Sequence, residues 1–105
     1  MNGTLLRFYV TENRKHEHEL LYQWLLECAH AAGIGGGSAF RALAGFGQHG
    51  VMRAEHFYEL AADVPVAVEF VTTDQQADTL LARLRELGID VFYVRSSAEF
   101  ASTAA

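Results

Sequence analysis

The 105-residue chain has one cysteine and few basic residues, and these shortages limit what the protein can be. Cys28 has no second cysteine to pair with, so an internal disulfide is excluded. Eight lysine and arginine residues against thirteen acidic residues give a formal net charge of −5, which argues against nucleic-acid binding. No apolar run approaches the length of a membrane-spanning helix. Residues 1–4 lead straight into a strand pattern rather than a signal peptide, so we expect a cytoplasmic protein.

Signatures of catalysis and of metal binding are also missing. The chain has neither a Walker A lysine pattern nor a Gly-x-Ser-x-Gly motif, and its carboxylates are scattered over expected helix surfaces. Cys28 lies on the apolar side of an expected helix, where a free cysteine usually behaves as a small hydrophobic residue. No zinc-ligand spacing is found among the five histidines, which are His16, His18, His30, His49 and His56. We therefore expect neither an enzyme nor a metal site.

Hydrophobic periodicity predicts one domain with the order strand, helix, strand, strand, helix, strand. The strands are expected at residues 5–10, 38–45, 64–72 and 89–95, and the helices from about residue 19 to 33 and from 73 to 88. Residues 4–95 would form the core of the domain, with 96–105 as a loose tail apart from Phe100. Residues 11–17 are charged and are expected to form a connection.

Each expected helix has a clear apolar stripe and a glycine at its end. The first stripe consists of Leu21, Trp24, Leu25, Cys28 and Ala32, and the second of Ala77, Leu80, Leu81, Leu84 and Leu87. Gly33 and Gly88 stand where left-handed C-terminal caps are expected. Thr73 and Gln76 have the spacing of a capping box at the start of the second helix.

This order predicts an α+β ferredoxin-like βαββαβ sandwich, in which both helices cover one face of a four-stranded sheet. The first and third strands are neighbours in this topology, so Arg7 and Glu69 can pair across them. The side chains expected on the other face are mostly apolar: Leu5, Arg7, Tyr9, Arg41, Leu43, Ala67, Glu69, Val71, Val91, Tyr93 and Arg95. We expect this face to be buried against other copies of the chain, and a solvated sheet face is the alternative.

A glycine-rich run begins where the first helix ends. Gly33, Gly35, Gly36 and Gly37 precede a strand of small residues, and that strand breaks at residues 45–47, which read Gly-Phe-Gly. Glycine permits unusual backbone angles and lets a ligand or another chain approach the backbone closely. A helix cap followed by a bent strand would explain the run without any ligand.

The order of these pieces resembles the PII family of trimeric signalling proteins. It is more similar to the uncharacterised PII-like group known as domain of unknown function one-ninety, over roughly residues 4–95. The matching pieces are the first strand, a Gly-Ile pair, a strand that carries Arg41, the Gly-Phe-Gly and, after a loop, an Asp-Val-Pro-Val at 63–66. The resemblance implies a homotrimer and a loop at 48–62 that contacts a regulated membrane transporter or enzyme.

The resemblance also implies a ligand site in the cleft between subunits. Gly45 and Gly47 match the two glycines at the base of the PII loop, Gln48 falls on the usual arginine, and His49 on the usual glutamine. Arg95 would bind phosphate, because a guanidinium offers a planar fork of donors. The expected ligand-binding residues are Arg41, Gly45, Phe46, Gly47, Gln48, His49 and Arg95.

One departure from the PII pattern concerns the size of the ligand. PII proteins have a glycine-rich phosphate loop before the last strand, but here the connection is only residues 87–90, and Asp90 would repel phosphate. An AMP- or ADP-like adenine nucleotide, a cyclic nucleotide or a small anion such as bicarbonate is therefore expected as the effector, rather than ATP. Several PII-like groups are associated with inorganic-carbon or metal-ion transport. The alternative is a CutA-like trimeric protein that binds divalent metals on the same fold.

Overall fold

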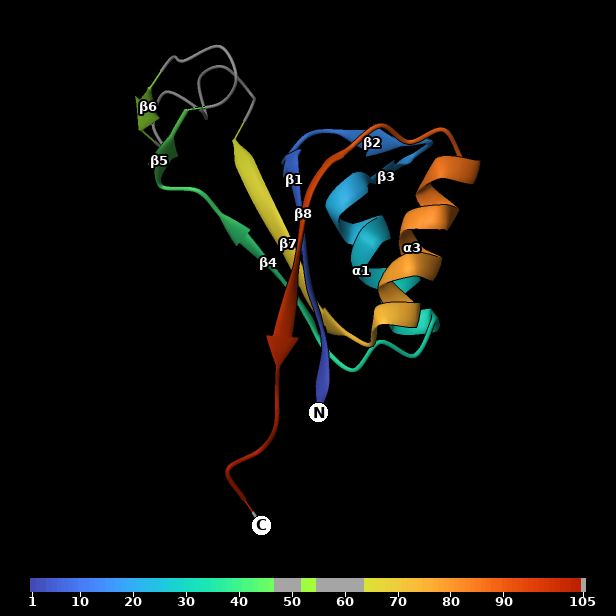
Figure 1. The fold of residues 1–105 in the computed structure, drawn as a ribbon. Coiled ribbons are helices and arrows are strands. Elements are labelled where there is room, and N and C mark those ends of the chain that lie inside the picture. The colour runs from blue at the N-terminus through green and yellow to red at the C-terminus, as the bar shows by residue number, and fades with distance from the viewer. Residues whose placement is uncertain (47–51, 55–63, 105) are drawn as a thin grey trace.

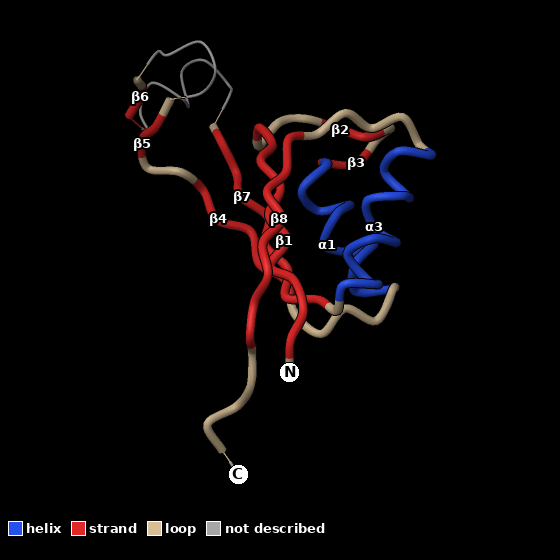
Figure 2. The backbone as a smooth tube through the Cα atoms, viewed as in Figure 1, coloured by secondary structure: helices blue, strands red, loops and turns tan. Residues whose placement is uncertain are grey.

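The computed structural model describes residues 1–46, 52–54 and 64–104. An antiparallel sheet of four strands carries the helices α1 (Leu21–Ala31) and α3 (Asp74–Glu86) on one face, and its other face is open (Figures 1 and 2). The strands are β1 (Asn2–Thr11), β4 (Gly37–Arg41), β7 (Pro65–Thr72) and β8 (Phe92–Glu99), in the spatial order β4-β7-β1-β8. The predicted ferredoxin-like arrangement is confirmed. No helix in these ranges is long and apolar enough to cross a membrane.

The core lies between the two central strands and the helices. Leu6, Phe8 and Val10 of β1 alternate with more exposed residues, as the sequence predicts, and they are buried beside Val68 and Phe70 of β7. The rings of Phe8 and Phe70 meet edge to face, with centroids 6.2 Å apart. Burying each of these large apolar side chains stabilises the fold by about 1.5–3 kcal/mol relative to leaving it exposed.

Helix α1 differs from its prediction by one position in the apolar stripe. Leu21 and Leu25 are buried and Trp24 and Cys28 pack at the edge of the core, but Ala29 takes the place predicted for Ala32. The helix ends at Ala31, so Ala32 lies in the cap rather than in the next turn. The predicted C-terminal cap itself is confirmed, because Gly33 has a left-handed φ of 82°.

The charged connection before α1 contains a short hairpin. Its strands are β2 (Lys15–His16) and β3 (Glu19–Leu20), and Glu17 in the turn has a left-handed φ of 58°. The imidazole of His16 packs edge-on against Trp24 of α1, with ring centroids 5.0 Å apart. The hairpin therefore packs on the start of the helix that follows it.

The capping box of α3 is confirmed in both of its hydrogen bonds. The Gln76 amide donates to Thr73 Oγ1 over 3.1 Å, and the Thr73 amide donates to Gln76 Oε1 over 3.0 Å. The predicted stripe is buried except for Leu87, which lies past the last turn and is exposed. Gly88 follows with a left-handed φ of 68°, as a C-terminal cap requires.

The predicted strand at 38–45 is divided into two. Its first part is β4, which pairs with β7, and the last bond between them runs from the Ala42 amide to the Pro65 carbonyl. The chain then leaves the sheet, and β5 (Ala44–Gly45) pairs instead with β6 (Arg53–Ala54) in an arm that projects from the body (Figure 1). Leu43 lies in this arm and is 74% exposed, so its predicted place on the open sheet face is wrong.

The last strand begins later and ends later than predicted, since β8 covers 92–99 rather than 89–95. Ile89 and Val91 lie in the connection before the strand, where their apolar side chains pack on the core. Beyond β8, the Phe100 amide donates to the Met1 carbonyl over 2.9 Å, so the first part of the predicted loose tail is ordered against the N-terminus.

The register of the edge strands corrects four predictions about the open face. Arg95 lies opposite Leu6 and Tyr93 opposite Phe8, so both side chains lie on the helix side of the sheet. Arg41 lies opposite Val66, a core residue, and is on the helix side as well. Val91, which precedes β8, packs on the core instead. In both edge strands the residues on the open face are shifted by one position from the predicted ones. Neither face of these strands is fully covered, so their sequences do not show a clear alternation.

The capping box yields a direct test of local stability. We expect Thr73→Ala to lower the free energy of unfolding by about 1 kcal/mol, because the Gln76 amide at the start of α3 loses the hydroxyl that accepts its hydrogen bond. Thr79→Ala is the matched control, since Thr79 is an exposed residue within the same helix and alanine favours helix there. Urea unfolding followed by circular dichroism measures both, and an equal stability of the two variants would contradict the assignment.

Candidate functional site

The residues predicted to surround the ligand fall at two separate places. Gly45 and Phe46 lie at the base of the arm, where Gly45 pairs with Arg53 of β6. The Phe46 side chain is exposed, as a residue offered to a ligand or a second chain would be. Gly47, Gln48 and His49 lie outside the described residues, as does most of the predicted 48–62 loop.

Arg41 ends β4 at the base of the same arm. Its Nε donates to Glu12 Oε2 over 2.7 Å, and its NH2 group is 3.5 Å from Glu12 Oε1. Glu12 directly follows β1 and is itself held by a bond from its amide to the Val64 carbonyl. The two side chains remain partly exposed, so the guanidinium is positioned but still accessible to water.

Arg95 lies in the opposite edge strand and faces helix α3. Its NH1 group contacts Asp78 Oδ1 at 2.6 Å, and its NH2 group lies 3.4 Å from the main-chain carbonyl of Asp74. Tyr93 is two residues away on the same face of β8 and accepts a bond from Arg85 of α3 over 3.4 Å. The helix side of β8 is thus lined by polar contacts with α3 rather than by a closed core.

One chain does not bring the two arginines together. They lie in the two edge strands, which are three strand spacings apart, and their register positions differ by four residues along the sheet. These offsets correspond to about 14 Å across the sheet and about 13 Å along it. A single phosphate therefore cannot touch both arginines of the same chain.

The connection between α3 and β8 is short, as predicted. The chain turns at Gly88, and the Ile89 amide donates to the Leu84 carbonyl over 3.0 Å. Ile89 and Val91 then pack on the core, so they hold the connection against the body of the protein. There is no glycine-rich segment here that could wrap around a chain of phosphates.

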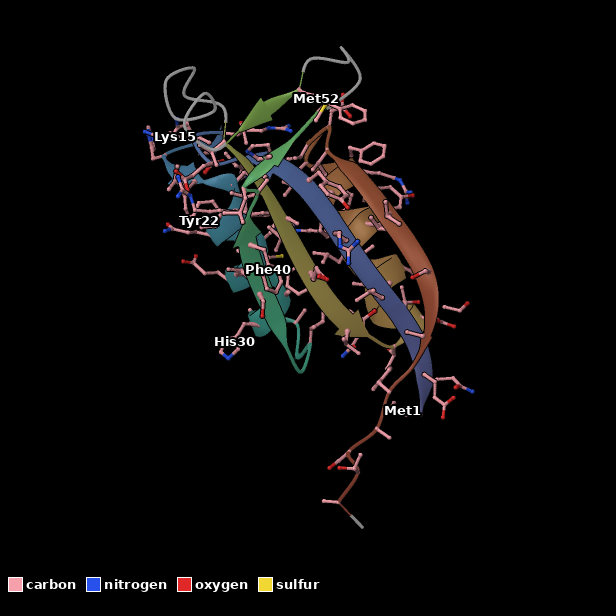
Figure 3. All side chains as sticks on the ribbon, turned by 90° about the vertical axis from the view of Figure 1, so that its left-hand side faces the viewer. Met1, Lys15, Tyr22, His30, Phe40 and Met52 are labelled. Carbon is pink, nitrogen blue, oxygen red and sulfur yellow. The ribbon has the colours of Figure 1, made fainter. Side chains whose placement is uncertain are left out.

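The open face of the sheet, which is turned toward the viewer in Figure 3, is mostly apolar and carries one ion pair. The register places the following side chains on it: Leu5, Arg7, Tyr9, Ser38, Phe40, Ala67, Glu69, Val71, Phe92, Val94 and Ser96. Three aromatic residues share one cross-strand row with Ala67: Phe40, which is 54% exposed, Tyr9, and Phe92, which is 70% exposed. The rings of Tyr9 and Phe92 lie 5.8 Å apart. Exposed apolar patches of this kind usually mark a contact with another protein.

The predicted pairing of Arg7 with Glu69 is confirmed at the centre of this face. The two residues are direct partners in the register, and Arg7 NH2 lies 2.9 Å from Glu69 Oε1. This hydrogen bond, together with a longer one to Tyr9, raises the pKa of the Arg7 guanidinium, so Arg7 stays charged. Because each charge has a partner inside the patch, the face can be covered at a smaller desolvation cost than two unpaired charges would bring.

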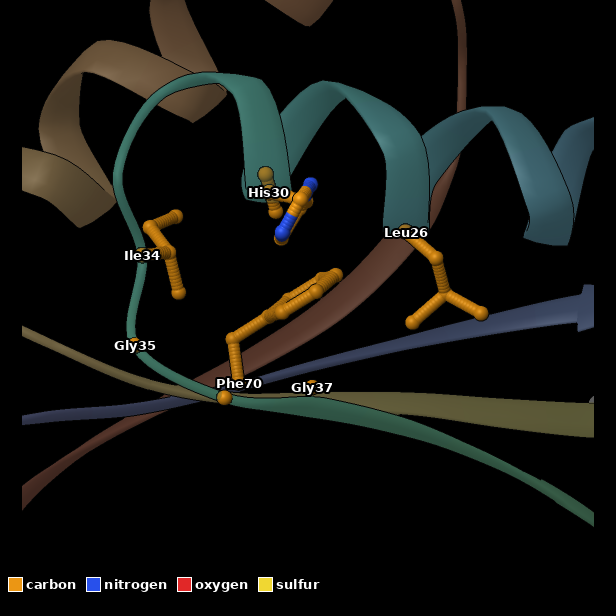
Figure 4. Close-up of a pocket in the computed structure, with 8 residues that line it drawn as sticks. Leu26, His30, Ile34, Gly35, Gly37 and Phe70 are labelled. Carbon is orange, nitrogen blue, oxygen red and sulfur yellow. The ribbon is translucent and has the colours of Figure 1, made fainter.

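A pocket of about 280 Å³ lies between α1 and the start of β4, at the glycine-rich run that follows the first helix (Figure 4). It is lined by Leu26, Ala29, His30, Ile34, Gly35, Gly36, Gly37 and Phe70. Gly37 is required there, because a Cβ atom at this position would lie 2.5 Å from the ring of Phe70. The lining contains no arginine or lysine, so this pocket does not suit a phosphate group.

The described part of the chain contains no group of three or more His, Cys, Asp or Glu side chains that could hold a metal ion. His16 packs on Trp24, and His30 is one of the residues that line the pocket. Glu19 and Glu27 are close enough for a shared hydrogen bond to raise the pKa of Glu19. His49 and His56 are not among the described residues.

Solved structures with the same fold are PII-like proteins. CPII from Thiomonas intermedia K12, described as a nitrogen regulatory PII-like protein bound to ADP, AMP and bicarbonate, superposes with a TM-score of 0.63 at 17% identity, over 93% of this chain and 87% of that one. A PII-like signaling protein from Thermus thermophilus superposes with a TM-score of 0.59 at 17% identity, over 93% and 86%. The fold is therefore PII-like.

The sequence places the chain in one particular family. The family model DUF190, described as "Uncharacterized ACR", matches residues 3–99. A UPF0166 protein of Aquifex aeolicus is 31% identical over 81 residues, which are 77% of each chain. A second UPF0166 protein, from Methanocaldococcus jannaschii, is 29% identical over 87 residues, 83% of this chain and 80% of the other. The chain belongs to the DUF190 (UPF0166) family.

Proposed function

We propose that the protein is a homotrimeric PII-like regulator that binds an adenine nucleotide between its subunits, with one PII-like domain in each chain. The observation that carries this proposal is the apolar open face of the sheet, which the chain's own helices leave uncovered. Burying that face against two further copies removes Phe40, Phe92 and Val71 from water and encloses the Arg7–Glu69 pair.

The positions of the two candidate arginines support a site that is shared between copies. Arg41 and Arg95 occupy opposite edges of one sheet, too far apart for one small ligand. In a cyclic trimer, each interface joins one surface of a subunit to a different surface of its neighbour. The β4 edge of one copy can therefore approach the β8 edge of the next. A ligand in that cleft would contact Arg41 and the base of the arm from one copy and Arg95 from its neighbour.

The chemistry of this cleft suits a small anion attached to a nucleoside. Two guanidinium groups supply planar forks of donors for phosphate, and the Gly45–Phe46 segment offers backbone and an exposed aromatic ring. The solved structure of CPII, which shares the fold, is bound to ADP, AMP and bicarbonate, so these are the first effectors to test. The short connection at Gly88 favours AMP, ADP or bicarbonate over ATP.

The arm would carry the signal to a target. It projects from the body beside the proposed cleft, and it exposes Leu43, Phe46 and Met52. A ligand at Arg41 and Gly45 would act directly on the base of this arm. We propose that the target is a membrane transporter or an enzyme and that the protein itself acts as a regulator rather than a catalyst.

Assembly through the open face is tested by placing a charge on it. We expect Val71→Glu to convert the trimer into monomers, because three unpaired carboxylates would be buried near one another. Thr79→Glu is the control, since it adds the same charge on the exposed side of α3. Light scattering on purified protein at micromolar concentration gives the molar mass. A wild-type monomer, or a trimer that survives Val71→Glu, would contradict the proposal.

Ligand binding is tested by calorimetry with AMP, ADP, ATP with magnesium, and bicarbonate. We expect AMP or ADP to bind more tightly than ATP, and Arg95→Ala to weaken AMP binding about tenfold or more, because a bond to a charged group contributes about 1.5–3 kcal/mol. Arg83→Ala removes the same charge from the exposed side of α3 and should leave binding unchanged. An affinity that Arg95→Ala does not alter would rule out this site.

A further inference from the structure

The guanidinium of Arg95 is already engaged by a carboxylate of its own chain. NH1 contacts Asp78 Oδ1 at 2.6 Å, and NH2 reaches the main-chain carbonyl of Asp74 at 3.4 Å. Asp78 lies one turn after Asp74 on the side of α3 that faces β8. A phosphate that binds Arg95 must therefore share the guanidinium with Asp78 or displace its carboxylate.

This ion pair is open enough for such an exchange. The side chain of Arg95 is 33% exposed and that of Asp78 is 67% exposed, so water reaches both partners. An exposed pair of this kind changes an equilibrium constant by only about two- to fivefold. A phosphate group carries more charge than a carboxylate and can use both arms of the guanidinium, so it is the stronger partner.

The neighbouring start of α3 offers no better place for the anion. The Gln76 amide is already bound by Thr73 Oγ1, and the carboxylate of Asp74 accepts a bond of 2.6 Å from the hydroxyl of Thr4. An anion there would be repelled by the Asp74 carboxylate, and the amides of the capping box already have hydrogen-bond acceptors. Arg95 is the group to which an anion at this edge of the sheet would bind.

We propose that Asp78 is an affinity-setting residue, an internal competitor that holds Arg95 until the phosphate of a nucleotide displaces it. This inference rests on the proposed function, since it concerns the same nucleotide site. Asp78 positions the guanidinium of Arg95 at the edge of the cleft and weakens the binding of every phosphate-bearing ligand. Ligands that carry no anionic group, such as adenosine, do not compete with Asp78, so their affinity is independent of it.

The test is calorimetry with AMP and with adenosine on the full-length protein. We expect Asp78→Asn to bind AMP about two- to fivefold more tightly than the wild type, since the competing charge is gone. Adenosine affinity should not change. Glu86→Gln, which removes a charge further along the same helix, should leave both affinities unchanged. Asp78→Ala should behave like Asp78→Asn, which separates the loss of charge from any effect of asparagine on the helix.

The same substitution in an Arg95→Ala background completes the test. There we expect Asp78→Asn to have no effect on AMP affinity, because the pair no longer exists. If wild-type protein binds AMP and Asp78→Asn does not tighten binding, or if the tightening persists without Arg95, the role of Asp78 is overturned while the nucleotide site stands. If the folded wild-type protein and its variants bind no adenine nucleotide, the proposed function and this inference both fail.

Discussion

The antiparallel register of β1 against both of its neighbours determines which side chains face the helices and which face outward. Side chains alternate between the two faces, so a shift of one residue in any strand would exchange its two sets. In this register Phe8 and Val68 meet under the helices, whereas Arg7 and Glu69 meet on the open face. The core, the apolar outer surface and the direction of Arg95 follow from that pairing, and the register of β4 against β7 turns Arg41 to the same side.

The two edge strands show where sequence reasoning succeeds and where it stops. The central strands and helices were predictable because one side of each is buried, and caps such as Thr73 and Gly88 follow local rules. The direction of Arg95 was not predictable. The apolar residues Ile89 and Val91 suggest the start of a strand, but they pack on the core in the connection before β8. In addition, neither face of β8 is fully buried, so its sequence does not show which residues face the helices. Part of the candidate site lies in the arm, and the local sequence does not reveal what the arm contacts.

The correction to Arg95 changes the account of the site. On the open face, this arginine would have been buried with Arg7 in the proposed interface between subunits. On the helix side it lies at the rim of the sheet beside Asp78, while Arg41 lies at the opposite rim beside Glu12. Each candidate anion-binding group is thus held by an acid of its own chain and kept at an edge that a second copy could reach. The apolar face can then serve assembly alone, while the rims serve the ligand.

The central claim is that one ligand site takes Arg41 from one copy and Arg95 from the next. Subunit mixing tests it most directly: Arg41→Ala chains and Arg95→Ala chains are unfolded together, refolded as mixed trimers, and titrated with AMP. Each variant alone should bind AMP weakly. In an equal mixture about a quarter of the sites should regain wild-type affinity, because those clefts join two intact arginines. A mixture that regains no sites, although it forms mixed trimers, would contradict the account.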